Sequence, residues 1–261
     1  ILVNLYDLEE FPEDYNTELY TTLADYYLKT EDYEKAAEYL ELALDTKIQK
    51  GTKIRYTYIL AQIYSELKSS DEAIDNFKKV VRMNPPYVMS FNAKVSMAGA
   101  FKAGGAGSND IKKVLNKMLR DSKNTEYLDQ IYFALANILM EEGEREKAIE
   151  YYHLSVAKSV QNNFQKGESC VTLANIYYNE PIYTMSAAYY DTAVNLLESD
   201  YPNYPTLMMR SRSLNKLVRN VNAYEMQDSV QILAGMTEAD RFAVIDGIIA
   251  DVVEREAEVQ R

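Results

Sequence analysis

Apolar positions along the chain recur with helical spacing inside a longer, regular period. A short pattern occurs five times: Leu or Met, then Ala, two variable residues and an aromatic or aliphatic residue. Its alanines lie 37, 37, 38 and 38 residues apart. Self-similarity at a fixed period in this range is typical of arrays of stacked supersecondary units. The alanines that anchor the five repeats are Ala24, Ala61, Ala98, Ala136 and Ala174.

A second helix is predicted to follow each motif helix. In four of the five repeats a small residue stands twelve positions after the alanine, and a large residue follows four positions later. Small residues let two antiparallel helices approach closely, and large neighbours fill the space beside them. Each pair leaves an apolar face that the next pair must cover. The small residues are Ala36, Ala73, Ala148 and Ser186, and the large ones are Leu40, Phe77, Tyr152 and Tyr190.

This spacing resembles the tetratricopeptide repeat family, whose period is about 34 residues. The resemblance implies an all-α fold, a tetratricopeptide-repeat superhelix of about five helix pairs followed by C-terminal capping and extra helices. It also implies a non-enzymatic scaffold that holds other proteins. We expect the end of an upstream helix and a linker at residues 1–15, the repeat array at 16–200 and the C-terminal helices at 201–261.

The third repeat departs from the pattern through a glycine-rich loop that contains Gly104, Gly105 and Gly107. We interpret Asp110, which stands where the small residue is expected, as a helix cap. The glycines suggest a phosphate cradle, but a P-loop also needs a preceding strand and a closing Lys-Ser/Thr pair. Neither is predicted here, so a flexible turn is the preferred interpretation. In the fourth repeat Gly143 is expected to supply the turn.

The repeat pattern stops after Pro202 and Pro205. The following apolar stripe should cover the exposed face of the fifth pair, and a shorter helix is expected around 226–235. Thr237 and Asp240 resemble a capping box that opens a last helix. We expect this helix to pack within the chain, with insertion into the groove or pairing with a partner as alternatives. The stripe is Leu207, Leu214, Leu217, Val218 and Val221, and the last helix has Phe242, Ile245, Ile249, Val252 and Val253 on its apolar side.

Charge and composition narrow the functional classes. The 28 Lys and Arg against 40 Asp and Glu give a net charge of −12, which argues against nucleic acid and anionic membranes as partners because these need clustered cations. One cysteine, Cys170, and one histidine, His153, are too few for a structural zinc site. A Cys–His nucleophilic pair would lack a third, orienting group. We therefore expect no enzyme activity, metal, cofactor or small-molecule substrate.

Six side chains are candidates for a protein-binding groove. In tetratricopeptide proteins the first helix of each pair lines a concave surface, and the residue after the motif alanine usually points into it. Asn side chains there can donate to and accept from an extended peptide backbone. The sequence around Asn137 and Asn175 contains no Lys or Arg, which disfavours recognition of a C-terminal carboxylate. The alternative is that these residues only pack against helices. The candidates are Asp25, Gln62, Asn137, Met140, Asn175 and Tyr178.

Longer segments resemble a narrower family. Together they are similar to the SprE/PorW family of the Bacteroidetes gliding-motility and type IX secretion apparatus. The likeness is strongest over residues 125–261, and the first half matches only at the level of the repeat. The segments are Asn162-Asn-Phe-Gln-Lys-Gly-Glu-Ser, Ala187-Ala-Tyr-Tyr-Asp-Thr-Ala-Val, Asp200-Tyr-Pro-Asn-Tyr, Leu217-Val-Arg-Asn-Val-Asn and Gln227-Asp-Ser-Val-Gln-Ile-Leu-Ala-Gly-Met-Thr-Glu-Ala-Asp-Arg.

This resemblance implies a periplasmic, outer-membrane-associated scaffold in a protein transport machine. Members of the family are outer-membrane lipoproteins, and the lipid-bearing cysteine would lie upstream because Cys170 falls mid-helix. Ile1 begins what looks like a helix cut part-way, so we expect a fragment of a longer protein. The expected partners are secretion-machine components or extended peptides. A general peptide-binding adaptor or co-chaperone is the alternative function.

Overall fold

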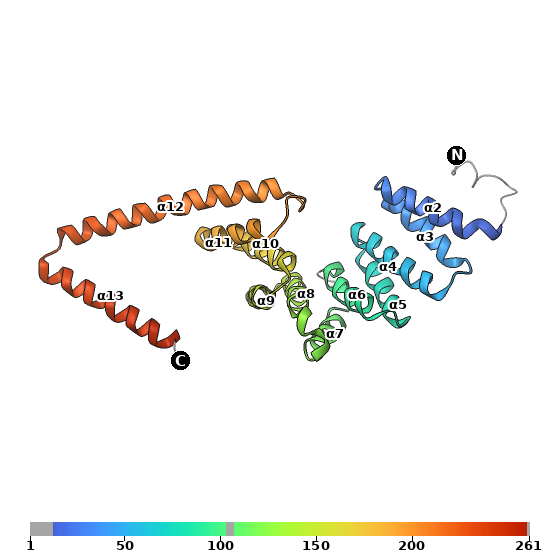
Figure 1. Ribbon diagram of the computed structural model, residues 1–261, viewed down its shortest axis with the longest axis horizontal. Coiled ribbons are helices and arrows are strands. Elements are labelled where there is room, and N and C mark those ends of the chain that lie inside the picture. The colour runs from blue at the N-terminus through green and yellow to red at the C-terminus, as the bar shows by residue number, and fades with distance from the viewer. Residues whose placement is uncertain (1–12, 103–106, 260–261) are drawn as a thin grey trace. The chain divides into compact units, whose positions relative to one another are not determined.

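Every element in the described part of the chain is helical. The structure is a computed structural model that describes residues 13–102 and 107–259, and over these ranges it contains twelve α-helices and two short 3-10 helices (Figure 1). The expected all-α fold is confirmed. The elements are η1 (Glu13–Tyr15), α2 (Asn16–Lys29), α3 (Tyr33–Asp45), α4 (Lys50–Glu66), α5 (Ser70–Arg82), α6 (Tyr87–Ala100), α7 (Ser108–Leu119), η2 (Ser122–Tyr127), α8 (Leu128–Glu141), α9 (Arg145–Lys158), α10 (Asn163–Asn179), α11 (Tyr183–Leu196), α12 (Tyr204–Gly235) and α13 (Glu238–Val259).

The chain divides into two compact units, Ile1–Leu173 and Ala174–Arg261. Helix α10 begins in the first unit and ends in the second. The array and C-terminal limits that the sequence suggests, 16–200 and 201–261, stay predictions. The expected upstream helix at the start of the chain, and Gly104 and Gly105 of the third repeat, lie outside the described residues.

Small residues lie where the two helices of a pair meet. The five motif alanines are at most 2% exposed, and their small partners in the second helices are 0% exposed. In one pair the Ser186 hydroxyl donates to the backbone carbonyl of Ala174 at 2.9 Å, so the second helix lies directly against the first. The large residues beside these contacts are also buried, which confirms the predicted packing positions: Leu40, Phe77, Tyr152 and Tyr190.

The first helices of four pairs end in the same hydrogen-bonded turn. In three of them the backbone is left-handed seven residues after the motif alanine, with φ of 60° at Glu31 and Lys68 and 79° at Gly143, and in the fourth Pro181 stands at this position with φ of 27°. The next N–H then donates to the carbonyl five residues earlier, which is the Schellman geometry of helix C-termini. The turn predicted at Gly143 is confirmed. The bonds run from Asp32 to Tyr27, from Ser69 to Tyr64, from Glu144 to Leu139 and from Ile182 to Tyr177, each at 2.9 Å.

The third pair, α6 and α7, has a different entry into its second helix. Gly107 precedes α7 with φ of +102°, a conformation that favours glycine. Its carbonyl accepts from the N–H groups of Asp110 and Ile111, both at 3.1 Å. Asp110 therefore lies in the first turn of α7 and is not its cap, which corrects the sequence interpretation. The apolar side of α7 is buried at Ile111, Leu115 and Met118.

One hydrophobic core runs from α4 to α8 in the first unit. Ile54, Phe77, Met97, Leu115 and Ile138, one from each of these five helices, belong to a single cluster of buried side chains. Burying a side chain of this size stabilises the fold by about 1.5–3 kcal/mol relative to leaving it in water. The stacking of successive pairs thus supplies the core that a single pair lacks.

Helix α12 is one continuous helix of 32 residues, where the sequence suggests two. It packs against α11, and its buried residues Leu207, Ser211 and Leu214 lie within its first turns. No described residue of α12 beyond Leu214 is buried. Neither Gly nor Pro occurs between Pro205 and Gly235, so nothing in that stretch ends the helix.

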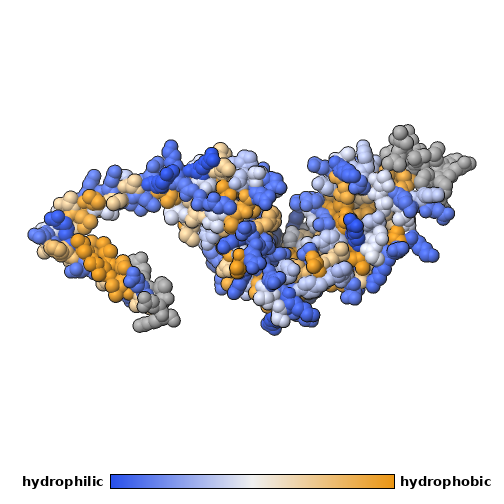
Figure 2. Space-filling view, in the orientation of Figure 1, coloured by the Kyte–Doolittle hydropathy of each residue, from blue (hydrophilic) through white to orange (hydrophobic). Residues whose placement is uncertain are grey.

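Helix α13 presents its apolar side to solvent. The Asp240 N–H donates to the Thr237 hydroxyl at 3.3 Å, and this hydroxyl donates to the Asp240 carboxylate at 2.7 Å, which confirms the predicted capping residues. Phe242 is 59% and Ile249 55% exposed, and Figure 2 shows hydrophobic side chains in a row along α13. The preferred expectation, packing of this face within the chain, does not hold for these side chains.

Candidate functional site

Asp25 and Gln62 lie exposed on the first helices of two successive pairs, α2 and α4. The Asp25 carboxylate accepts from the Lys29 ammonium at 2.6 Å one turn later on the same helix. Both side chains of this pair are more than half exposed, so it adds little to stability. Asp25 and Gln62 are both accessible to a partner, as a groove residue must be.

The amide oxygen of Asn137 is hydrogen-bonded within its own helix pair, and its amide nitrogen is not hydrogen-bonded to any described residue. Its Oδ1 accepts from the Tyr152 hydroxyl at 2.7 Å, which joins α8 to α9. Burial, and to a smaller extent the charge of Glu141, raises the pKa of Tyr152 to about 12, so this hydroxyl remains a donor at neutral pH. Only Nδ2 of Asn137 is left to donate to a ligand. Met140, the other candidate on α8, is half-buried.

Asn175 repeats this arrangement in the second unit and adds a cation. Its Oδ1 accepts from the Tyr190 hydroxyl at 2.5 Å, across the same spacing of 15 residues as Asn137 and Tyr152. Arg210 of α12 donates from Nη1 to Asn175 Oδ1 at 3.1 Å and to the Tyr190 hydroxyl at 3.0 Å. Its guanidinium lies over the Tyr178 ring, 5.6 Å from the centroid. Two of the candidates, Asn175 and Tyr178, therefore meet in one cluster.

Arg210 corrects the expectation that no cation lies near Asn175. The two residues are 35 positions apart, and their contact depends on how α12 packs against α11. No pattern in the sequence identifies this arginine. The recurring Asn–Tyr spacing of 15 residues, in contrast, can be read from the sequence and is a signal from which these internal hydrogen bonds could have been predicted.

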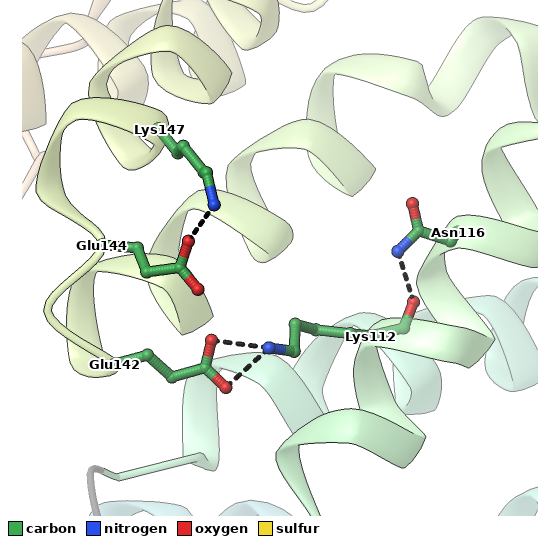
Figure 3. Close-up of polar contacts among 5 residues, drawn as sticks. All are labelled: Lys112, Asn116, Glu142, Glu144 and Lys147. Atoms are coloured by element: carbon green, nitrogen blue, oxygen red, sulfur yellow. Dashed lines mark hydrogen bonds and ion pairs between the residues drawn. The ribbon is translucent and has the colours of Figure 1, made fainter.

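In the first unit, charges gather around the turn between α8 and α9 (Figure 3). Lys112 of α7 donates to both carboxylate oxygens of Glu142, at 2.7 and 2.6 Å, and these side chains are only 24% and 20% exposed. In the turn that follows, Glu144 pairs with Lys147, and this hydrogen bond and its charges lower the pKa of Glu144 and raise that of Lys147. Asn116 donates to the Lys112 carbonyl at 2.8 Å. This network fastens α7 to the next pair.

The outer face of α7 is basic on a chain that is acidic as a whole. A shallow concavity of about 520 Å³ lies along it. Lys113 is 79% exposed and reaches Asp110 only at 3.8 Å, whereas Lys112 is compensated by Glu142. The lining residues are Asn109, Lys112, Lys113, Asn116, Lys117 and Arg120.

Cys170 and His153 lie in environments that do not favour catalysis. Cys170 is fully buried, and burial raises the pKa of its thiol to about 11 against a smaller lowering by Lys166. The nucleophile of a cysteine enzyme is the thiolate, which such a pKa suppresses. Burial lowers the pKa of the His153 imidazole. Within the described ranges, no cluster of three or more His, Cys, Asp or Glu residues is arranged to hold a metal ion.

Of the helices in the described residues, none has both the length and the apolar content that a membrane crossing requires.

Comparison with known proteins identifies the repeats. Residues 17–47 and 54–87 match a family model described as tetratricopeptide repeat, and residues 131–164 match a second model with the same description. No curated protein sequence matches the chain. The matched segments begin with the helices that carry Ala24, Ala61 and Ala136.

Solved structures share the fold at low sequence identity. The apo form of RapI has a TM-score of 0.56 and 12% identity, and the match covers 99% of this chain and 79% of that one. A Rap protein complexed with Competence and Sporulation Factor has a TM-score of 0.55 and 15% identity, covering 94% and 75%. These likenesses show the fold alone. The matched tetratricopeptide repeats support a protein–protein interaction scaffold. The chain is an all-α protein that contains tetratricopeptide repeats, matched at residues 17–47, 54–87 and 131–164.

Proposed function

We propose that the chain is a non-enzymatic scaffold that binds other proteins through first-helix side chains of its repeats. The observation that carries this proposal is the pair of first-helix residues Asn175 and Tyr178 on α10, which lie beside Arg210 of α12 and place polar and aromatic groups at an exposed position. Tyr178 is 42% exposed and Arg210 is exposed as well. Residues of these types are enriched at binding hot spots in protein interfaces. The small residues of the repeat motif, such as Ala174 and Ser186, are instead buried where two helices pack together.

Substitution of the Asn amides tests the binding role. Asn137→Asp retains an acceptor for Tyr152 but removes the Nδ2 donors, so a groove binder should lose affinity for its protein or peptide ligand. The matched control is Asn116→Asp, which adds the same charge on the exposed outer side of α7. Binding is measured by pull-down and on peptide arrays. Equal binding by both variants would speak against the groove at Asn137.

The proposed setting is the type IX secretion and gliding machinery. We infer a periplasmic, outer-membrane-associated component that bridges other envelope proteins, with a lipid anchor upstream of the chain. Support comes from the resemblance of segments such as 162–169 and 227–241 to the SprE/PorW family. A pull-down with the full chain from a Bacteroidetes periplasmic extract should recover secretion-machine proteins. Recovery of unrelated peptides alone would contradict this setting and leave the scaffold role in place.

A general peptide-binding adaptor or co-chaperone is the second candidate. It is favoured by the recurrence of one arrangement, Asn held by Tyr, on α8 and on α10, because each arrangement leaves an amide donor that can bind a peptide backbone. An adaptor of this kind should bind many array peptides and lose them with both Asn137→Asp and Asn175→Asp. A dedicated scaffold should instead retain a small set of protein partners.

A further inference from the structure

Arg210 is held on one side of its guanidinium. Both of its hydrogen bonds to the described residues come from Nη1, one to Asn175 and one to the Tyr190 hydroxyl. An arginine side chain carries five N–H donors. The donors on Nε and Nη2 form no hydrogen bond to the described part of the chain. These two nitrogens share the edge of the guanidinium that engages carboxylates with two parallel bonds.

The charge of Arg210 is also uncompensated. No carboxylate of the described residues lies within ion-pairing distance of it, and the side chain is exposed. Lys112 in the first unit shows the contrast, because its ammonium is bound by both oxygens of Glu142. Arg210 is instead oriented by neutral groups and keeps its charge available.

Aromatic surface continues from the guanidinium. The Tyr178 ring lies under Arg210, and the Tyr183 ring lies edge-on to Tyr178 with centroids 6.0 Å apart. These rings are 42% and 40% exposed. The row from Arg210 through Tyr178 to Tyr183 therefore offers a cation followed by apolar contact area.

We propose that this row binds an acidic segment of a partner protein, with an Asp or Glu side chain on the Nε–Nη2 edge of Arg210 and a neighbouring apolar residue on the tyrosines. The inference rests on the proposed scaffold function and names the chemistry of its partner. Asn175 and Tyr190 orient the guanidinium before the ligand arrives, so little rotamer freedom is lost on binding. The partner group is an internal side chain and not a chain terminus.

Selection of peptides tests this without a known ligand. A random peptide library, displayed on phage as N-terminal fusions so that no free C-terminal carboxylate is present, is panned on the full chain and on Arg210→Gln. Panning at about physiological salt, where the Debye length is about 8 Å, screens the remaining negative charge of the chain. The wild-type chain should enrich Asp or Glu next to an apolar residue, and Arg210→Gln should lose this preference.

Synthetic peptides make the test quantitative. One enriched sequence, acetylated and amidated, should bind Arg210→Gln about tenfold more weakly than wild type, because a charge-assisted pair is removed. Arg212→Gln, a matched change of an exposed arginine that lines a different groove between α11 and α12, should bind as wild type does. Tyr178→Ala, which leaves the bonds of Arg210 to Asn175 and Tyr190 in place, should also weaken binding. Circular dichroism checks that each variant is folded.

Several outcomes would overturn the inference. These are equal acidic enrichment on wild type and Arg210→Gln, enrichment of basic or neutral sequences, and binding that requires a free C-terminal carboxylate. If wild type selects peptides without acidic preference, the inference fails while the scaffold function stands. If it selects none and also recovers no protein from an extract, both fail.

Discussion

At the ends of three first helices, Glu31, Lys68 and Gly143 adopt the same left-handed backbone conformation although their side chains differ. Gly143 adopts φ of 79° without a steric penalty, whereas Glu31 and Lys68 adopt φ of 60° with a side chain attached. For a residue with a Cβ, this conformation costs roughly 1–2 kcal/mol. The three turns therefore differ in stored strain although their hydrogen bonds are alike.

The variant Gly143→Ala should destabilise the chain by about 1 kcal/mol, because a Cβ is forced into the left-handed region. Nothing lies within 4 Å of the added Cβ, so the effect would come from the backbone alone. Urea unfolding followed by circular dichroism measures it. Gly99→Ala is the control: Gly99 lies in the last turn of α6 with equal space around it and without a positive φ, and this variant should be stabilised by up to about 0.5 kcal/mol. A loss of stability in both would contradict the explanation.

We expect the folded chain to lose stability in alkali because the Tyr152 hydroxyl is buried. Its pKa rises from the ordinary 10.0 to about 12, so folding favours the protonated form. The resulting stability is present below pH 10 and is lost as the pH rises towards about 12. Tyr152→Phe should be less stable by about 1 kcal/mol near neutral pH, through its lost hydrogen bond. Its unfolding free energy should then fall less steeply between pH 10 and 12. Parallel pH curves would show that Tyr152 does not titrate in this way.

At this scale, the sequence predicts packing residues well and contacts of polar side chains poorly. Ala136, Tyr152 and their equivalents follow from spacing, because the fold repeats the same helix crossing. Arg210 does not, because its position relative to Asn175 follows from the packing of a helix outside the repeat pattern. The candidates Asn137 and Asn175 were expected to offer both donor and acceptor, but internal tyrosines take the acceptor.

The apolar side of α13 is exposed to solvent, whereas the apolar sides of the repeat helices are buried. Ile249→Ser should change the unfolding free energy by less than about 0.5 kcal/mol, because Ile249 is 55% exposed. Leu135→Ala in α8, at 2% exposure, should cost about 2–5 kcal/mol. Urea unfolding compares the two. A large effect at Ile249 would mean that the apolar face of α13 is covered in solution.

Element boundaries were predicted where the sequence contains a turn residue or a capping pair. Gly143 and the Thr237–Asp240 pair are such signals, and the structure has helix ends at both. The expected break before 226–235 had no signal of this kind, only a change in the apolar stripe, and α12 passes through it. The apolar stripe changes there because α12 no longer packs on α11, not because the helix ends.

For the whole molecule, the net charge of −12 should weaken the folded state at low ionic strength. Raising the salt concentration to about 0.15 M shortens the Debye length to about 8 Å and screens this repulsion, so the thermal midpoint should rise. Glu38→Lys should show a smaller rise, because it removes an exposed carboxylate one turn from Glu34 on α3. Thermal melts at two salt concentrations measure both. A midpoint that falls with salt would indicate that attractive ion pairs outweigh the repulsion.

The complete burial of Cys170 turns the only thiol of the chain into an internal reporter. A maleimide dye reaches this sulfur only when the surrounding helices separate. The rate at which Cys170 is labelled therefore measures how often these helices open, without any engineered probe. A second cysteine placed on the surface would label far faster, and the two reactions would separate on kinetics alone. Fluorescent tags can thus be attached at a chosen position without first replacing Cys170.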